Sequence, residues 1–181
     1  MAVLVDCYSA KKYELHSNLS TKIELEINLV KNVRFDFCID RDDYLNWIPF
    51  EFRLKVGECE VYEYPKELGV TLNLAELKQF FKSMDDLFCK IEERIDSGEN
   101  SFEETREVKF FAMETYFGLD FVDAFDGLIG VTVWVRMASL PQHTEGGFDR
   151  GIRYTATLTN VQLFVSRLRH QLELLISSSI Q

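Results

Sequence analysis

The sequence predicts an α+β fold in which two amphipathic helices pack on antiparallel sheets. Two kinds of periodicity predict it: strict apolar–polar alternation over short runs, and apolar residues at helical spacing over two longer runs. The strands come in groups separated by the helices, which is typical of α+β proteins and not of alternating β–α units. At 181 residues one domain over 1–181 is expected, with a strand-rich half over 1–64 and a helix–strands–helix half over 65–181.

Two pairs of strands are expected before the first helix. Residues 23–29 and 33–39 alternate apolar and polar side chains around a short polar turn, as in a hairpin. Residues 50–56 alternate again until Gly57 breaks the pattern, and 59–62 is expected to return as the partner strand. Polar residues at every second position predict that one face of this sheet lies in water.

The first helix is expected over about 74–96. Asn73 can cap its N-terminus, with Glu76 three residues later in a capping-box-like arrangement. Ser97-Gly98 ends the run, because glycine readily adopts the left-handed backbone that follows a helix. Apolar residues recur every three or four positions and predict one buried face. These residues are Leu74, Leu77, Phe81, Met84, Phe88, Ile91 and Ile95.

Further strands are expected after this helix. One covers 108–113, with either its even-numbered or its odd-numbered side chains toward the core. The segment 116–125 is both aromatic and acidic, and its class stays open. Residues 129–135 alternate strictly, and 152–158 is expected to return beside them after a glycine-rich loop over 139–151.

The second helix is expected over about 160–176, capped by Thr159 or Asn160. Its apolar residues again recur at helical spacing and predict a face that lies on a sheet. They are Val161, Phe164, Val165, Leu168, Leu172, Leu175 and Ile176.

Composition excludes several classes of protein. No apolar run approaches the ~18 residues of a membrane-spanning helix, and the N-terminus lacks the basic start of a signal peptide. We therefore expect a cytoplasmic protein that does not engage a membrane. Cysteines occur at 7, 38, 59 and 89, without the paired spacing of a zinc site, and are expected to stay reduced.

Motifs that carry chemistry are missing from the sequence. It contains no GxSxG, HExxH, GxGxxG or GxxxxGK[ST] pattern, and His16, His143 and His170 stand in three different contexts. The acids at 40–43 are not a calcium loop, because Leu45 occupies the position that requires glycine. We expect no catalytic residue, no cofactor and no metal, although acids distant in sequence can meet in a fold.

The negative charge is concentrated in one region. Residues 85–126 hold thirteen acids and four bases, which accounts for −9 of the net charge of −10. This region predicts a surface that docks a basic protein, because complementary charge steers encounter and orients a partner. The alternative is a solvated helix end and loop with no partner. The residues predicted to contact the partner are Glu92, Glu93, Asp96, Glu99, Glu103, Glu104, Glu107, Asp120, Asp123 and Asp126.

Aromatic residues are interleaved with these acids and could anchor the same partner, or else belong to the core. They are Phe102, Tyr116, Phe117, Phe121 and Phe125. Direct binding of nucleic acid is not expected, because it requires a basic stripe and the acids would repel phosphate.

The chain also resembles a known family over about residues 60–176. The resemblance lies in Leu-Asn-Leu-Ala-Glu-Leu opening one helix, Val-Thr-Val-Trp-Val in a strand, and Thr-Asn-Val-Gln-Leu-Phe-Val-Ser-Arg-Leu opening the other helix. In these features it is similar to WapI-type immunity proteins, which neutralise bacterial polymorphic toxins. The resemblance implies a non-catalytic cytoplasmic inhibitor of a toxin or nuclease domain and transfers no catalytic residue.

Two other functions stay open at this point. An acidic anti-defence protein that mimics DNA would space its carboxylates like phosphates, about 3.4 Å apart along a strand. An enzyme or small-ligand binder would need a deep pocket that contains His16 or His143 together with paired acids.

Overall fold

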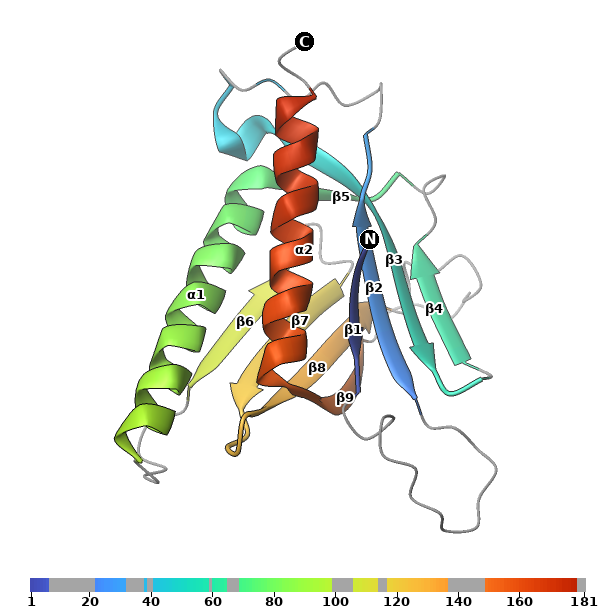
Figure 1. Cartoon of the computed structure of the whole chain (residues 1–181). Helices are drawn as coiled ribbons and strands as arrows, with labels where there is room; N and C mark the ends of the chain where they lie inside the picture. Colours follow the sequence, from blue (N-terminus) through green and yellow to red (C-terminus); the bar gives the residue numbers. More distant parts are fainter. Residues whose placement is uncertain are drawn as a thin grey trace.

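The computed structural model contains two antiparallel sheets and two long helices within the residues it describes (Figure 1), which confirms the α+β prediction. Neither helix is apolar over a long enough stretch to cross a membrane. The structure describes residues 1–6, 22–31, 38, 41–58, 60–64, 69–98, 106–113, 117–136 and 149–178.

The first sheet has the order β1–β2–β3–β4, with β5 paired to the start of β3. The strands expected at 23–29, 50–56 and 59–62 are confirmed, whereas the one expected at 33–39 falls almost wholly outside the described residues. β3 begins earlier than predicted and includes Pro49, whose carbonyl accepts a hydrogen bond from the Val30 amide at 2.9 Å. The strands are β1 (Ala2–Val5), β2 (Ile23–Leu29), β3 (Trp47–Val56), β4 (Glu60–Tyr64) and β5 (Thr71–Asn73).

The second sheet follows chain order, β6–β7–β8–β9. In its first strand the even-numbered side chains face the core, so that Val108, Phe110 and Ala112 are buried. The segment left open at 116–125 supplies β7, and the strand expected at 129–135 is confirmed as β8. The strands are β6 (Glu107–Phe111), β7 (Phe117–Asp123), β8 (Leu128–Arg136) and β9 (Asp149–Thr157).

Aromatic rings join the two sheets in one core. The Phe117 ring of β7 lies 5.3 Å from both Phe50 and Phe52 of β3, measured between ring centroids. Phe117 and Phe121 are only 3% and 0% exposed, so they belong to the core and cannot anchor a partner. Of the two roles that the sequence left open for the aromatics of the acidic region, these two residues therefore have the core role.

Helix α1 (Leu74–Ser97) starts and stops where the sequence predicts. The Asn73 side chain accepts from the Ala75 amide at 3.0 Å and donates to the Tyr44 carbonyl at 2.9 Å. Gly98 follows the helix with a left-handed φ of 66°. One predicted apolar position is wrong: Ile95 is 49% exposed, and the buried position beside it holds Arg94.

Helix α2 (Leu158–Ser177) starts two residues before the predicted start. Its cap is Thr157, whose hydroxyl accepts from the Asn160 amide at 3.2 Å, and not Thr159 or Asn160. The earlier start has a tertiary cause, because the Leu158 amide donates to the Gly127 carbonyl at 2.8 Å and so turns the chain directly out of β9. Farther along α2, the Gln171 side chain accepts from the Leu29 amide at 2.8 Å, which ties the helix to β2.

Candidate functional site

The ten predicted carboxylates do not form one continuous surface in the described part of the chain. Glu99, Glu103 and Glu104 lie outside the described residues. The other seven divide among the last turns of α1, the two strands β6 and β7, and the turn between β7 and β8. They are Glu92, Glu93 and Asp96 on α1, Glu107 on β6, Asp120 and Asp123 on β7, and Asp126 in the turn.

Asp123 is a structural residue, which corrects its prediction as a partner contact. Its carboxylate accepts two hydrogen bonds from the Arg94 guanidinium, at 2.9 Å and 3.1 Å. The side chains of Arg94 and Asp123 are only 6% and 4% exposed. The pair therefore joins the end of α1 to the end of β7, where no partner can reach it. Arg94 stands three residues after Ile91 on the buried face of α1. This helical spacing is the feature of the sequence from which a buried cation could have been predicted.

The turn after Asp123 has an unusual backbone. Phe125 and Asp126 have φ values of 64° and 50°, and Gly127 follows at 70°. Asp126-Gly127 is a favoured pair for a type I′ turn, which the Leu128 amide closes by donating to the Phe125 carbonyl at 2.8 Å. A left-handed phenylalanine, in contrast, costs about 1–2 kcal/mol.

The Arg94–Asp123 pair also holds this phenylalanine. The Phe125 amide donates to Asp123 Oδ1 at 3.0 Å, and the Arg94 guanidinium carbon lies 4.8 Å from the centre of the Phe125 ring. Strained backbone persists only where the surroundings determine it, and it clusters at functional sites. The turn that carries Asp126 is thus fixed relative to the end of α1.

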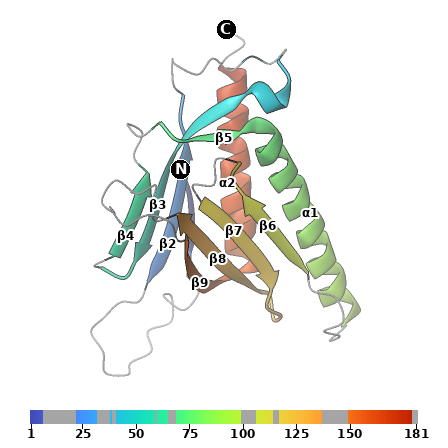
Figure 2. The ribbon, with the colours of Figure 1, turned by 180° about the vertical axis from the view of Figure 1, so that it is seen from behind.

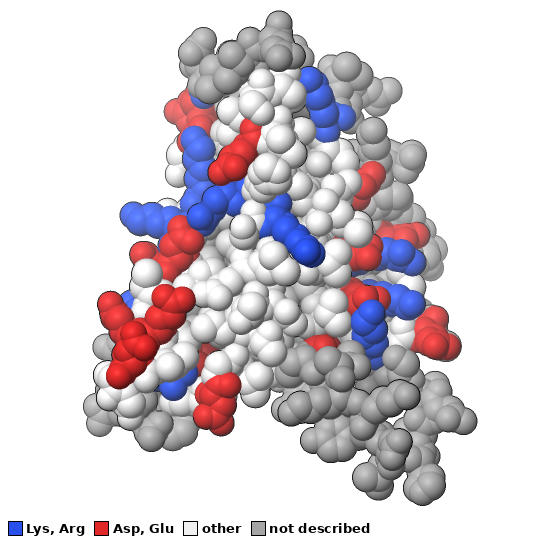
Figure 3. Space-filling view, viewed as in Figure 1, with Lys and Arg blue, Asp and Glu red and all other residues white. Residues whose placement is uncertain are grey.

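Glu92, Glu93, Asp96 and Asp126, which we call the acidic end, are all exposed. Figure 3 shows acidic side chains dominating the lower end of α1, whereas farther up the helices acids and bases are interspersed. Glu92 accepts a hydrogen bond from Gln162 of α2 at 3.0 Å, so the start of α2 borders this end.

The acids on α1 do not stabilise the helix to which they belong. A helix C-terminus carries partial negative charge, so a carboxylate in the last turn, such as Asp96, costs about 0.3–1 kcal/mol. Glu92, Glu93 and Asp96 lie in the last two turns, where the only basic residue of the final turn is the buried Arg94. The acidic end is therefore a surface that helix stability alone does not explain.

Glu107 and Asp120 lie elsewhere, on the face of the second sheet that points away from the helices. Glu107 forms an ion pair with Lys109 at 3.0 Å. Hydrogen bonding and charge from Glu107, with a further contribution from Asp120, raise the pKa of Lys109. Asp120 accepts a hydrogen bond from the Trp134 indole at 2.7 Å. Both carboxylates are thus engaged within their own sheet.

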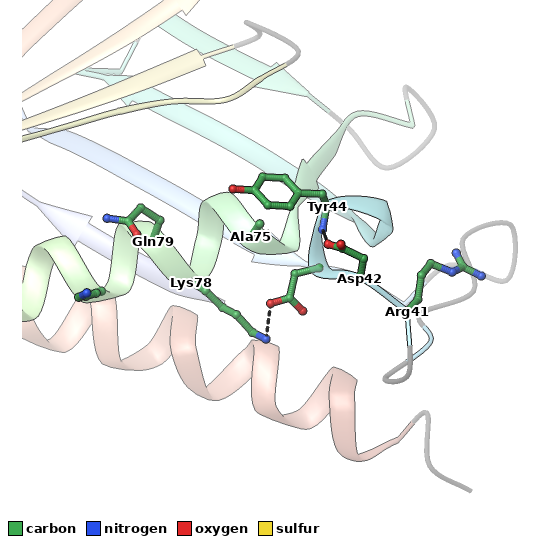
Figure 4. Close-up of a pocket in the computed structure, with 8 residues that line it drawn as sticks. Arg41, Asp42, Tyr44, Ala75, Lys78 and Gln79 are labelled. Carbon is green, nitrogen blue, oxygen red and sulfur yellow. Dashed lines mark hydrogen bonds and ion pairs between the residues drawn. The ribbon is translucent and has the colours of Figure 1, made fainter.

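An open groove lies at the other end of α1 and carries no catalytic arrangement (Figure 4). It has a volume of about 640 Å³ beside the short helix η2 (Asp43–Leu45). Asp42 caps η2 by accepting from the Tyr44 amide at 2.9 Å, and Asp43 accepts from Lys78 at 2.7 Å. Both acids therefore have structural roles. Across the described residues, no three His, Cys, Asp or Glu side chains converge to hold a metal ion.

Comparison with known proteins yields no match to a family model, to a curated protein or to a solved structure. A function for the acidic end therefore has to be argued from its own geometry and charge.

Proposed function

We propose that this protein is a non-catalytic, protein-binding inhibitor of the immunity type. It docks a basic toxin or nuclease domain through the acidic end and acts in the cytoplasm. The observation that carries the proposal is the gathering of Glu92, Glu93, Asp96 and Asp126 at one end of the molecule, on two elements held together by the buried Arg94–Asp123 pair.

Rigid placement of these carboxylates supports a docking role. Complementary charge raises association rates by roughly 10–10³-fold and discriminates between partners, provided that the charges are held in position. The net charge of −10 draws a basic partner from a distance, and the acidic end orients it. A DNA mimic would need a longer row of phosphate-like carboxylates, and no observation on the described residues favours one.

The test uses charge reversal at the acidic end with a control of equal charge. The variant is Glu92→Lys, Glu93→Lys and Asp96→Lys. The control is Glu58→Lys, Glu63→Lys and Glu173→Lys, three exposed acids on the β3–β4 turn, β4 and the outer side of α2. Both triple variants change the net charge equally, and they reverse it at opposite parts of the molecule.

Each version is co-expressed with a panel of basic nuclease domains from bacterial polymorphic toxins, and growth is measured. We expect wild type and the control to protect cells from at least one domain, and the acidic-end variant to lose that protection. Undiminished protection by the acidic-end variant contradicts the proposed surface. The absence of protection against the whole panel counts against the proposed function itself.

A further inference from the structure

The outer faces of the two sheets differ in chemistry. In the first sheet, acids and bases lie opposite each other on neighbouring strands: Glu24 faces Lys55, and Arg53 stands between Glu26 and Glu63. Such pairs suit a face in contact with water. In the second sheet, one row across the strands contains two aromatic residues and two glycines. This row runs Phe111, Gly118, Trp134 and Gly151.

The glycines let the aromatic rings lie down on this face. A Cβ atom added to Gly118 would meet the Phe111 ring at 2.5 Å, and one added to Gly151 would meet the Trp134 ring at 2.7 Å. Each ring therefore covers the glycine of the next strand. The bond from the Trp134 indole to Asp120, at 2.7 Å, fixes the orientation of the larger ring. The result is an aromatic surface in which the Trp134 ring has little rotamer freedom left to lose on binding.

Much of this apolar surface is open to solvent. Phe111 is 55% exposed, and Met113, just beyond the same strand, is 54% exposed. Figure 2 looks onto this face, with α2 behind the sheet and α1 at its side next to β6. We call the two aromatic residues of this row, Phe111 and Trp134, together with the neighbouring Met113, the aromatic row.

The face as a whole is electrically balanced. The two rows of residues between the aromatic row and the β7–β8 turn carry two bases, Lys109 and Arg153, and two acids, Glu107 and Asp120. This face therefore does not attract a basic partner by charge. An exposed phenylalanine and an exposed arginine beside a partly buried tryptophan are instead the composition of an interface centre, where burial of apolar area slows dissociation.

Its distance from the turn that carries Asp126 fits a single interface, which continues around that turn to Glu92, Glu93 and Asp96 on α1. Trp134 stands seven residues along β8 from Gly127, or about 23 Å at 3.3 Å per residue. A standard interface covers about 800 Å² on each partner, which is a patch about 32 Å across. The β7–β8 turn, which carries Asp126, is the direct continuation of this sheet.

We propose that the aromatic row is the apolar anchor of the same docking surface, so that the basic partner lies across the acidic end and the outer face of the second sheet. This inference rests on the proposed function. It specifies the partner as a protein with a basic patch and an apolar patch on one surface. The centres of the two patches lie about 20–25 Å apart, which is the distance along β8 from the β7–β8 turn to Trp134. The acidic end sets the rate of association, and the aromatic row sets the lifetime of the complex.

The experiment separates these two rates. The probe is the catalytically inactivated toxin domain against which the chain protects cells, and association and dissociation are followed by surface plasmon resonance. The anchor variant is Phe111→Ser with Met113→Ser. Its control is Leu45→Ser with Leu174→Ser, two residues that are 61% and 55% exposed on η2 and the last part of α2. We expect the anchor variant to raise the dissociation rate about tenfold or more with little change in association, and the control to leave both unchanged.

The fluorescence of Trp134 provides a second measurement, which leaves the aromatic row unmutated. In Trp47→Phe, Trp134 is the only tryptophan, and its emission should shift to shorter wavelength when the toxin domain covers it. An unchanged dissociation rate in the anchor variant, or an unshifted Trp134 spectrum in a bound complex, overturns the anchor and leaves the proposed function standing. If no toxin domain binds, both proposals fall.

The same variants decide whether a second copy of the chain covers this face. Sedimentation of the wild-type chain alone should give a monomer. A dimer that the anchor variant dissociates would assign the aromatic row to self-association and so overturn its role in docking the toxin domain.

Discussion

Tyr154 is a buried residue of β9 whose hydroxyl is left out of the hydrogen-bond network. It is 6% exposed, and the hydroxyl oxygen has no hydrogen-bond partner among the described residues. A buried polar group without a partner costs about 1–3 kcal/mol of desolvation. Burial raises the pKa of this phenol, and the charge of Asp6 raises it further, because the ionised form would be both desolvated and repelled.

Replacement of Tyr154 by phenylalanine should stabilise the protein by about 1 kcal/mol at pH 7, because only the unpaired hydroxyl is removed. The wild type should also lose stability as the pH rises above about 10, where the unfolded tyrosine ionises and the folded one does not, by up to about 1.4 kcal/mol per pH unit. Below pH 10 this contribution is fully present. Urea unfolding at pH 7 and at pH 10.5 measures both effects, and an equally steep alkaline loss in Tyr154→Phe would contradict the assignment.

Between elements, the Arg94–Asp123 pair is the main polar connection from α1 to the second sheet among the described residues. A buried ion pair adds little net stability, because desolvation offsets the attraction, but removal of one partner leaves a buried charge. Its contribution here is to position: it fixes the β7–β8 turn and supports the left-handed Phe125.

Arg94→Met should therefore destabilise the protein by about 3–5 kcal/mol, because Asp123 is left charged and buried. The double variant Arg94→Met with Asp123→Leu should recover most of that loss, since no isolated charge remains. Lys90→Met, at an exposed position of the same helix, is the control and should change stability by less than about 0.5 kcal/mol. Urea unfolding provides the comparison, and a double variant as unstable as the single one would contradict this account.

At the scale of the whole molecule, two charge effects would act on the basic partner that we propose. The net charge of −10 would attract it from any direction, and the acidic end would attract it to one place. Salt screens both over a Debye length of about 8–10 Å near physiological ionic strength.

Charge reversal at the acidic end should slow association with the toxin domain by about tenfold or more at low salt, and the difference from wild type should shrink as salt is added. The matched reversal of Glu58, Glu63 and Glu173 should slow association much less. Stopped-flow association rates from about 20 to 500 mM salt provide the measurement. Equal slowing by the two triple variants would mean that net charge alone steers the partner and that the acidic end has no special role.

The sequence by itself determined most of the secondary structure, because the signals involved are local. Alternation placed β2, β3 and β8, while Asn73 and Gly98 placed both ends of α1. The cap of α2 could not be placed in this way. It depends on a bond between Leu158 and Gly127, which are thirty-one residues apart in the chain.

Only the tertiary structure decided what each acid of the charged region does. In sequence Asp120, Asp123 and Asp126 are three equivalent carboxylates within seven residues. In the fold, one accepts a bond from Trp134, one is buried against Arg94, and one is exposed in a turn. The physical reason is that the sequence shows only where the charged residues stand along the chain. Strand register and side chains from distant elements decide which of those residues are buried or paired.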